Sequence, residues 1–268
     1  MEKEKVMGKR ISWLTVLWVV STVSGANAAP PTEHFLICIP GGPGTAEEAD
    51  ARLGTFLDSL GEGVVSLKGH YAVTKEACEA ILLQHKPRFA LFSHAELRER
   101  AQALKPVPLL TVTPVDEQPI QYFIVAQKGV TFDSLKGKSL LSPHWPEESL
   151  LSQVAFKRDL KAHFSGKKGS ALRALKKVAK GKADAALLDA LEHASMKELP
   201  FANNLDVVLT SIELPGLAIV ELGGLTALGK KLRTAGARLC SSSSDACKAV
   251  EMKELKPSEP KEYDILLK

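Results

Sequence analysis

A glycine-rich loop near the start of the chain has the residue types of an anion cradle. Gly41, Gly42 and Gly44 follow an apolar run, and Thr45 opens a segment rich in Ala and Glu. Backbone N–H groups at a helix start can bind an anion, so Gly42, Gly44 and Thr45 are candidate ligand contacts. Thr45 and Glu48 also form the T-x-x-E pattern of a capping box, in which the helix satisfies its own donors. A structural turn is the favoured interpretation, because no Gly-Lys-Ser/Thr follows at P-loop spacing.

A second candidate site runs from residue 142 to residue 148, where the sequence reads SPHWPEE. The hydroxyl of Ser142 and the imidazole of His144 can donate hydrogen bonds to an anion, and histidine can change its charge near neutral pH. Trp145 needs a packing partner or a ligand, because an indole ring in a loop is costly to leave in water. The alternatives are a plain surface role for His144 and simple burial, between lobes or against Pro146, for Trp145.

Three further candidates follow from where strands are expected to end. In open α/β sheets, the carboxyl ends of the strands and the starts of the next helices line the ligand site. This rule selects Ser93 and His94 after one apolar run, and Asp189 at the end of another, ADAALLD. For Asp189 we favour a role as the N-cap of the following segment LEHASM over a ligand contact.

Catalytic, metal and nucleic-acid functions find little support in the sequence. There is no GxSxG or HExxH motif, the seven histidines are scattered, and the cysteine spacings match no zinc pattern. We therefore expect no enzyme, no metal and no cofactor. The net charge of +4 is mild. Ten Lys or Arg residues between 157 and 182 are best explained as a solvated helical face, because few aromatic residues accompany them, so no nucleic-acid partner is expected.

The elements that must position these residues alternate between strand and helix. Apolar runs predict strands at 33–40, 64–67, 88–93, 107–115, 120–127, 139–142, 183–188, 205–209 and 217–220. Helical spacing predicts helices at 46–60, 75–84, 94–103, 150–163, 170–180 and 226–239. This βαβα order predicts an α/β fold in which mainly parallel sheets are flanked by helices.

Two proline-containing stretches divide the chain into two lobes. The stretch 114–119 is the first predicted crossing between the lobes, and the stretch around Pro215 is the second. Residues 29–115 and 217–268 are then expected to form lobe 1, and residues 116–216 lobe 2. A cleft between two such lobes is a natural ligand site, and hinge closure is its usual motion.

The first 28 residues have the pattern of a signal peptide. Basic residues precede an apolar stretch from Ile11 to Val23, and Ala26-Asn27-Ala28 fits the small-x-small cleavage pattern. The apolar stretch is shorter than the roughly 20 residues of a membrane span. We expect cleavage near Ala28 and export, with an uncleaved N-terminal anchor as the alternative.

Export would place the four cysteines in an oxidising compartment. Cys240 and Cys247 flank a short polar loop, so a disulfide between them is expected. Cys38 lies in the first apolar run and Cys78 in a helical segment. For this second pair, a disulfide and two buried thiols remain equally open.

Four segments together resemble the type 2 periplasmic solute-binding proteins, in particular the phosphate/phosphonate-binding branch associated with ABC transporters. They read PGGPGTAEEA, YFIVAQKGVTFDSLKGKSLL, SALRALKKVAKGKADAALLD and LTSIELPG, and they span most of the chain from Pro40 to Gly216. The resemblance implies a periplasmic-binding-protein type 2 fold, with two lobes joined by two crossing strands. It also implies that Tyr122 lies over the cleft, although packing in the core is the favoured alternative.

The function that the resemblance implies is capture of a small solute, with an oxyanion favoured, in the periplasm for an ABC permease in the inner membrane. A monomer is expected. The acids Glu47, Glu48, Glu147 and Glu148 would repel a bound dianion, which weakens the expectation of a phosphate. The alternative is a sensing or partner-binding module of the same fold, since fold alone does not separate these functions.

Overall fold

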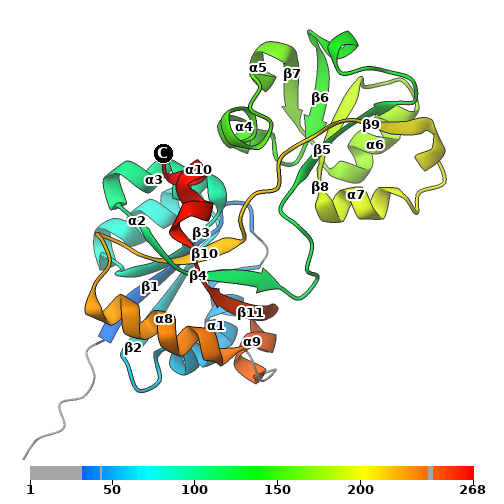
Figure 1. Cartoon of the computed structure of the whole chain (residues 1–268). Helices are drawn as coiled ribbons and strands as arrows, with labels where there is room; N and C mark the ends of the chain where they lie inside the picture. The colour runs from blue at the N-terminus through cyan, green and yellow to red at the C-terminus, as the bar shows by residue number, and fades with distance from the viewer. Residues whose placement is uncertain (1–31, 43, 241–243) are drawn as a thin grey trace, which may run out of the picture.

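The chain folds into two α/β lobes that are joined by two connecting segments (Figure 1). The computed structural model describes residues 32–42, 44–240 and 244–268, so the predicted signal peptide lies outside the described residues. No helix in the described part of the chain is long and apolar enough to cross a lipid bilayer. The lobe boundaries at residues 115 and 216 stay a prediction.

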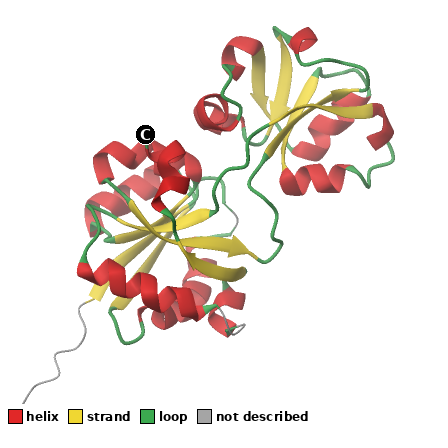
Figure 2. Cartoon of the chain, viewed as in Figure 1, coloured by secondary structure: helices red, strands yellow, loops and turns green. Residues whose placement is uncertain are grey.

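Lobe 1 is built on a six-stranded sheet with the strand order β11-β4-β10-β3-β1-β2. Its strands are β1 (Thr32–Cys38), β2 (Ser66–Ala72), β3 (Phe89–Phe92), β4 (Val107–Pro114), β10 (Leu217–Glu221) and β11 (Met252–Pro257). Its helices are α1 (Ala46–Gly61), α2 (Lys75–His85), α3 (His94–Leu104), α8 (Ala227–Leu239), α9 (Asp245–Ala249), the short η5 (Pro260–Tyr263) and α10 (Asp264–Leu267). Figure 2 shows these helices on both sides of the sheet.

Lobe 2 is built on a five-stranded sheet with the order β7-β6-β8-β5-β9. Its strands are β5 (Tyr122–Gln127), β6 (Lys138–Ser142), β7 (Phe164–Lys168), β8 (Ala185–Asp189) and β9 (Leu205–Thr210). Its helices are η1 (Asp133–Leu135), η2 (Trp145–Glu147), α4 (Glu148–Leu150), η3 (Leu151–Ala155), α5 (Leu160–His163), α6 (Ala171–Ala179), α7 (Ala190–Met196) and η4 (Ala202–Asn204). The two-lobed α/β class predicted from the sequence is confirmed.

Both sheets are mixed: parallel pairings, as expected from the sequence, are combined with antiparallel ones. In lobe 1, β1 pairs in parallel with β2 and β3, whereas β10 is antiparallel to both β3 and β4. In lobe 2, β6 pairs in parallel with β7 and β8, whereas β5 is antiparallel to β8 and β9. β5 and β10 are the first strands after each connection between the lobes. The edge strand β11 of lobe 1 is also antiparallel to its neighbour β4.

Amphipathic helices cover the two sheets. Helix α1 buries Phe56, Leu57 and Leu60 against lobe 1, and each such side chain contributes roughly 1.5–3 kcal/mol of burial free energy. Helix α6 buries Leu175 and Val178 in lobe 2, while its basic residues lie on the exposed face, as the sequence predicted.

The predicted helix at 150–163 is interrupted in the structure. It divides into α4, η3 and α5. The break between η3 and α5 contains Lys157, which adopts a left-handed backbone conformation with φ of 51°. Asp159 then caps α5, since its side chain accepts a hydrogen bond of 2.8 Å from the backbone N–H of Ala162. The strand β7 that follows was not predicted, because its sequence FSGKK lacks an apolar run.

Both pairs of cysteines form disulfides. The Cα atoms are 5.6 Å apart in Cys38–Cys78 and also in Cys240–Cys247. The expected Cys240–Cys247 bond is therefore present, and the open question about Cys38 and Cys78 is answered in favour of a disulfide. The Cys38–Cys78 bond joins the end of β1 to α2.

The two connections between the lobes are held together at one point. Ile120 in the first connection and Leu214 in the second form an isolated antiparallel bridge. Close by, Nε2 of His94 lies 2.8 Å from the carbonyl oxygen of Pro215, and the hydroxyl of Tyr263 donates a 3.0 Å hydrogen bond to the carbonyl oxygen of Gly216. These contacts anchor the second connection to lobe 1. The N–H of Ile212 also donates a 2.9 Å hydrogen bond to the carbonyl oxygen of Ala155, so this connection is held at its lobe 2 end as well.

Candidate functional site

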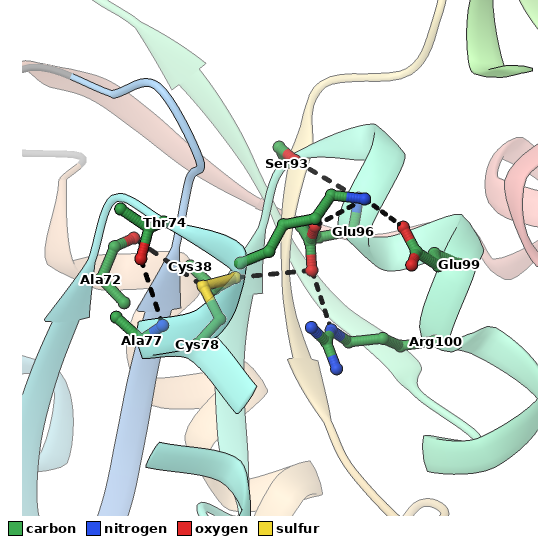
Figure 3. The surroundings of a disulfide bond; sticks show 10 residues. Cys38, Ala72, Thr74, Ala77, Cys78, Ser93, Glu96, Glu99 and Arg100 are labelled. Atoms are coloured by element: carbon green, nitrogen blue, oxygen red, sulfur yellow. Dashed lines mark hydrogen bonds and ion pairs between the residues drawn. A yellow bond between two sulfur atoms is a disulfide. The ribbon is translucent and has the colours of Figure 1, made fainter. Parts of the chain in front are cut away.

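Lobe 1 presents charged side chains where α2 and α3 begin. Lys75 is the first residue of α2, and Glu96 lies in the first turn of α3. One carboxylate oxygen of Glu96, Oε2, accepts a 2.8 Å hydrogen bond from Nε of Arg100 and lies 3.8 Å from Sγ of Cys38. Figure 3 shows Glu96 between the disulfide and Arg100. The disulfide thus packs directly against the charged start of α3.

The other carboxylate oxygen of Glu96 has an incomplete set of partners. The side chain of Glu96 is fully buried, and its Oε1 has no hydrogen bond within the described part of the chain. Its nearest cation is Nζ of Lys75 at 3.7 Å, and that ammonium makes its short contact, 2.6 Å, with Glu99 instead. A buried carboxylate oxygen without a donor is costly, so this oxygen is suited to accept a hydrogen bond from a ligand.

Lobe 2 contributes a second group of charges on the ends of β6 and β8. Nε2 of His144 lies 3.1 Å from Oε2 of Glu192 and 3.5 Å from Oδ2 of Asp189. The ring of Tyr122 meets the ring of His144 edge to face at 5.5 Å, and Tyr122 also shares a hydrogen bond with Glu147. One imidazole is therefore surrounded by three carboxylates and a phenol.

The ionisation of these groups follows from their burial and their neighbours. Burial alone would lower the pKa of His144, but hydrogen bonds with Asp189 and Glu192 raise this pKa to about 9. The imidazole is therefore positively charged at neutral pH. Burial raises the pKa of Glu147, and the charge of Glu96 adds to this effect. Burial also raises the pKa of Tyr122, so this phenol stays protonated.

The two groups face each other across the junction of the lobes. The charges of Glu96 and Lys75 in lobe 1 act on the carboxyl of Glu147 in lobe 2, and Nη2 of Arg98 donates a 2.6 Å hydrogen bond to Oε1 of Gln153 between α3 and lobe 2. We call the following residues the inter-lobe cluster: Lys75, Glu96, Tyr122, His144, Glu147, Asp189 and Glu192.

A hollow of about 420 Å³ lies beside the inter-lobe cluster and is lined by both lobes. Its walls come from α3, from Ser149 and Leu150 of lobe 2, and from the C-terminal residues Leu266 to Lys268. The residues of the inter-lobe cluster do not line this hollow. Within the cluster, the side chain of Lys75 is 52% exposed and that of Asp189 is 37% exposed.

Three of the predicted site residues come together in the inter-lobe cluster: Tyr122, His144 and Asp189. Tyr122 is also buried in the core, and Asp189 also caps α7, because its Oδ1 accepts a 2.8 Å hydrogen bond from the N–H of Glu192. From the sequence we favoured core packing for Tyr122 and an N-cap role for Asp189. Both residues have these roles, and both also belong to the inter-lobe cluster.

Three other candidates use their polar atoms inside the protein. Ser142 is fully buried; its hydroxyl donates to the carbonyl oxygen of Leu187 and accepts from the N–H of His144. Ser93 caps α3, and His94 is buried against the second connection. These residues shape the site, but their hydrogen-bonding groups already have partners.

The glycine loop forms a capped turn at the end of β1. Thr45 accepts a 3.3 Å hydrogen bond from the N–H of Glu48 and donates its own N–H to that carboxylate, as in a capping box. Gly44 has φ of +79°, a conformation that favours glycine. At Gly42, a Cβ atom would lie 2.8 Å from the carbonyl oxygen of Ile39. The conformation of the turn therefore explains why glycine occupies positions 42 and 44, without a bound anion.

Trp145 packs within lobe 2. A Cβ atom on Gly166 of β7 would lie 1.9 Å from the indole ring, so the ring rests on the glycine backbone. We predict that Gly166→Ala lowers the free energy of unfolding by about 1–2 kcal/mol, since the ring must move. The matched control is Gly169→Ala, where a Cβ atom meets nothing within 4 Å. Urea denaturation checks this, and equal effects of the two substitutions would contradict the packing argument.

Sequence reasoning did not select Lys75, Glu96, Glu147 and Glu192 as site residues. Glu147 was recognised only as an acid in the first turn of a candidate cleft helix. For Glu96 and Glu192, the sequence contained a signal in the patterns S-x-x-E at 93–96 and D-x-x-E at 189–192, which indicate helix starts. The same pattern places a carboxylate at the strand ends that line the cleft.

The comparisons with known proteins support the fold. No family model and no curated protein sequence matches this chain. Among solved structures, XAC2383 from Xanthomonas citri bound to ATP has a TM-score of 0.62 at 15% identity, with 88% of this chain and 94% of that chain covered. The binding protein component of an ABC phosphonate transporter from Pseudomonas aeruginosa has a TM-score of 0.55 at 14% identity, with coverages of 89% and 83%.

A third solved structure is PhnD1 from Prochlorococcus marinus in complex with methylphosphonate. Its TM-score is 0.55 at 16% identity, and 88% of this chain and 95% of that chain are covered. The chain studied here thus has the fold of the two-lobed type 2 periplasmic solute-binding proteins. At these low sequence identities the solved structures support the fold alone. The chemistry of the site follows from the residues of this chain.

Proposed function

We propose that this protein captures a small polar solute between its two lobes, outside the inner membrane, and presents it to an ABC permease. The observation that carries the proposal is the inter-lobe cluster, in which charged groups from both lobes converge where parallel strands end and helices begin. The two disulfides are consistent with an oxidising compartment. The proposal involves a monomer and no catalytic step.

The helix starts at the cleft argue against an oxyanion as the solute. Thr45, Thr74 and Ser93 each accept a hydrogen bond from a backbone N–H group of their own helix. The N–H groups that would grip a phosphate are therefore already used in part. Glu48 and Glu96 add negative charge in the same first turns, and this charge repels a dianion.

A solute with an ammonium or guanidinium group fits the inter-lobe cluster better. The cluster holds four carboxylates, on Glu96, Glu147, Asp189 and Glu192, against the cations Lys75 and His144. Outside the cluster, Arg100 also pairs with the carboxylate of Glu96. Oε1 of Glu96 has only the ammonium of Lys75, at 3.7 Å, and no hydrogen bond of ordinary length with the described residues. A charged N–H donor on the solute would supply one. We therefore propose a cationic or zwitterionic solute, in place of the oxyanion expected from the resemblance.

Binding titrations on the chain from Ala29 onward test this proposal. In that chain Trp145 is the single tryptophan, and it lies two residues from Glu147, so its emission reports on closure of the lobes. The probes are L-arginine, L-lysine, spermidine, inorganic phosphate and methylphosphonate. We expect a saturable change with at least one of the first three, and a loss of affinity of about tenfold or more with Glu147→Gln, as for a charge-assisted hydrogen bond.

Glu148→Gln is the matched control for Glu147→Gln. The side chain of Glu148 contacts the hydroxyl of Ser152 within its own lobe, so this neighbour should leave affinity unchanged. Binding of phosphate or methylphosphonate alone would refute the cationic solute while keeping the cleft as the site. If none of the probes changes the emission or the melting temperature, capture of these solutes is excluded, and the sensing or partner-binding module becomes the better hypothesis.

A further inference from the structure

Three histidines that are far apart in the sequence meet on lobe 1. His34 lies on β1, His70 on the edge strand β2, and His85 in the last turn of α2. Nδ1 of His34 is 2.9 Å from Nε2 of His70, and the rings of His70 and His85 stack with their centroids 4.2 Å apart. One ring nitrogen from each of the three lies within 4.8 Å of the others. We call these three residues the histidine cluster.

The histidine cluster is separate from the solute site. Helix α2 runs from Lys75, which belongs to the inter-lobe cluster, to His85 at its other end. Eleven residues of helix span about 16 Å, so the two clusters lie at opposite ends of α2. The C-terminal end of a helix carries partial negative charge, which favours a cation there.

The residues around the histidine cluster allow a ligand to approach. All three histidines are half-buried, so each ring is held by packing but still reaches solvent. The charged groups that act on His70, besides the other two histidines, are Lys68 on the same strand and Asp50 on α1, which have opposite signs.

We propose that His34, His70 and His85 form a binding site for a divalent transition metal ion. Zinc binds imidazole nitrogens at 2.0–2.1 Å, so three ligands around one tetrahedral ion lie about 3.3 Å from each other. The present spacing of the ring nitrogens reaches that arrangement through small side-chain rotations. Imidazole ligands suit Zn²⁺, Cu²⁺ and Ni²⁺ rather than Mg²⁺ or Ca²⁺. The fourth position faces solvent, where a water molecule completes the coordination.

The proposal departs from the expectation of no metal. That expectation rested on histidines scattered through the sequence, and a site assembled from two adjacent strands and the end of a helix has no local spacing pattern. The three ligands lie on regular elements, two strands and a helix, which hold them in place before metal binds and so reduce the entropy lost on binding.

Isothermal titration calorimetry with zinc chloride, on a tag-free chain from Ala29 onward, tests the site. We expect one equivalent of Zn²⁺ to bind and the melting temperature to rise. His70→Ala and His85→Ala should each weaken binding by about tenfold or more, since each removes a ligand. Cobalt(II) should give the visible absorption of a four-coordinate ion in the wild type and lose it in both variants.

His193→Ala is the matched control, because His193 is also half-buried and stacked on an aromatic ring, that of Phe123, but lies outside the histidine cluster. It should bind Zn²⁺ as the wild type does. His144→Ala tests whether the second possible metal group, His144 with Asp189 and Glu192, binds the ion instead. Binding that His144→Ala abolishes and that His70→Ala and His85→Ala leave unchanged would overturn the proposal, as would no binding at all. His85→Ala, at a helix end, keeps the test valid if His70→Ala fails to fold.

Discussion

Replacing Cys38 and Cys78 together with alanine is expected to lower the free energy of unfolding by about 4 kcal/mol. The two cysteines are 40 residues apart in the sequence, and a cross-link over a loop of this length removes about 4 kcal/mol of chain entropy from the unfolded state. Both side chains are fully buried, so alanine is the better replacement, because serine would bury a hydroxyl group. Urea denaturation of the oxidised wild type and of the double variant measures the difference.

The Cys240–Cys247 disulfide is the matched control. It spans 7 residues, for which the same relation gives about 2 kcal/mol. Its two sulfur atoms are also buried, so the comparison isolates loop length. An equal or larger loss on removing Cys240 and Cys247 would contradict the account based on loop length.

The same substitution should also affect the candidate site. The Cys38–Cys78 bond holds α2 against β1, and Sγ of Cys38 lies beside the carboxylate of Glu96. Lys75 at the start of α2 is the cation nearest the free oxygen of Glu96. We therefore expect the Cys38→Ala/Cys78→Ala variant to bind the solute more weakly even at temperatures where it stays folded, and the Cys240→Ala/Cys247→Ala variant to bind it normally.

The sequence predicted the architecture well because local signals and the fold agree. Apolar runs such as RFALFS became β3, and the cap at Thr45 became the start of α1. The predictions failed where long-range contacts, and not the local sequence, determine the structure of a segment. The strand β7 pairs with β6 despite its polar sequence, since Gly166 lets Trp145 pack on it. The antiparallel direction of β5 and β10 depends on which lobe the chain enters, and that information is not local.

The candidate site was only partly predictable for a related reason. The strand-end rule selected His144 and Asp189, because it needs only the order of elements, and the family resemblance selected Tyr122. The structure places these three residues side by side. Their partners could not be predicted in this way. Glu96 reads as an ordinary acid in a helix start, and its burial against Cys38 and Arg100 appears only when two helices and a strand meet. The histidine cluster could not be predicted from the sequence either, because the spacing of His34, His70 and His85 follows no helical or strand period.

The second large effect expected is a pH dependence of stability that His144→Ala removes. Hydrogen bonds with Asp189 and Glu192 outweigh burial and raise the pKa of His144 from 6.5 to about 9. A group whose pKa is higher in the folded state contributes stability that is complete below its unfolded pKa and is lost as the pH rises through the folded pKa. This shift corresponds to roughly 3 kcal/mol, lost between about pH 6.5 and pH 9.

The groups around His144 set the direction of this effect. Asp189 and Glu192 on the α7 side and Glu147 on η2 carry the compensating charges, and the phenol of Tyr122 stays neutral because burial raises its pKa. His70 does not interfere, since its folded pKa of about 4 lies below the unfolded value. The contribution of His70 to the free energy of unfolding therefore changes only between about pH 4 and pH 6.5. This range lies below the pH range in which the contribution of His144 changes.

The measurement compares the free energy of unfolding of the wild type and of His144→Ala across pH 6 to 10. We expect the variant to be less stable by roughly 3 kcal/mol at pH 6.5 and equal to the wild type above the folded pKa. His193→Ala is the control, because burial lowers the pKa of His193 and it should leave the slope above pH 6.5 unchanged. A constant difference between wild type and His144→Ala at all pH values would mean that the imidazole acts through packing alone. The charge of His144 would then be unavailable to balance the carboxylates that we propose to bind the solute.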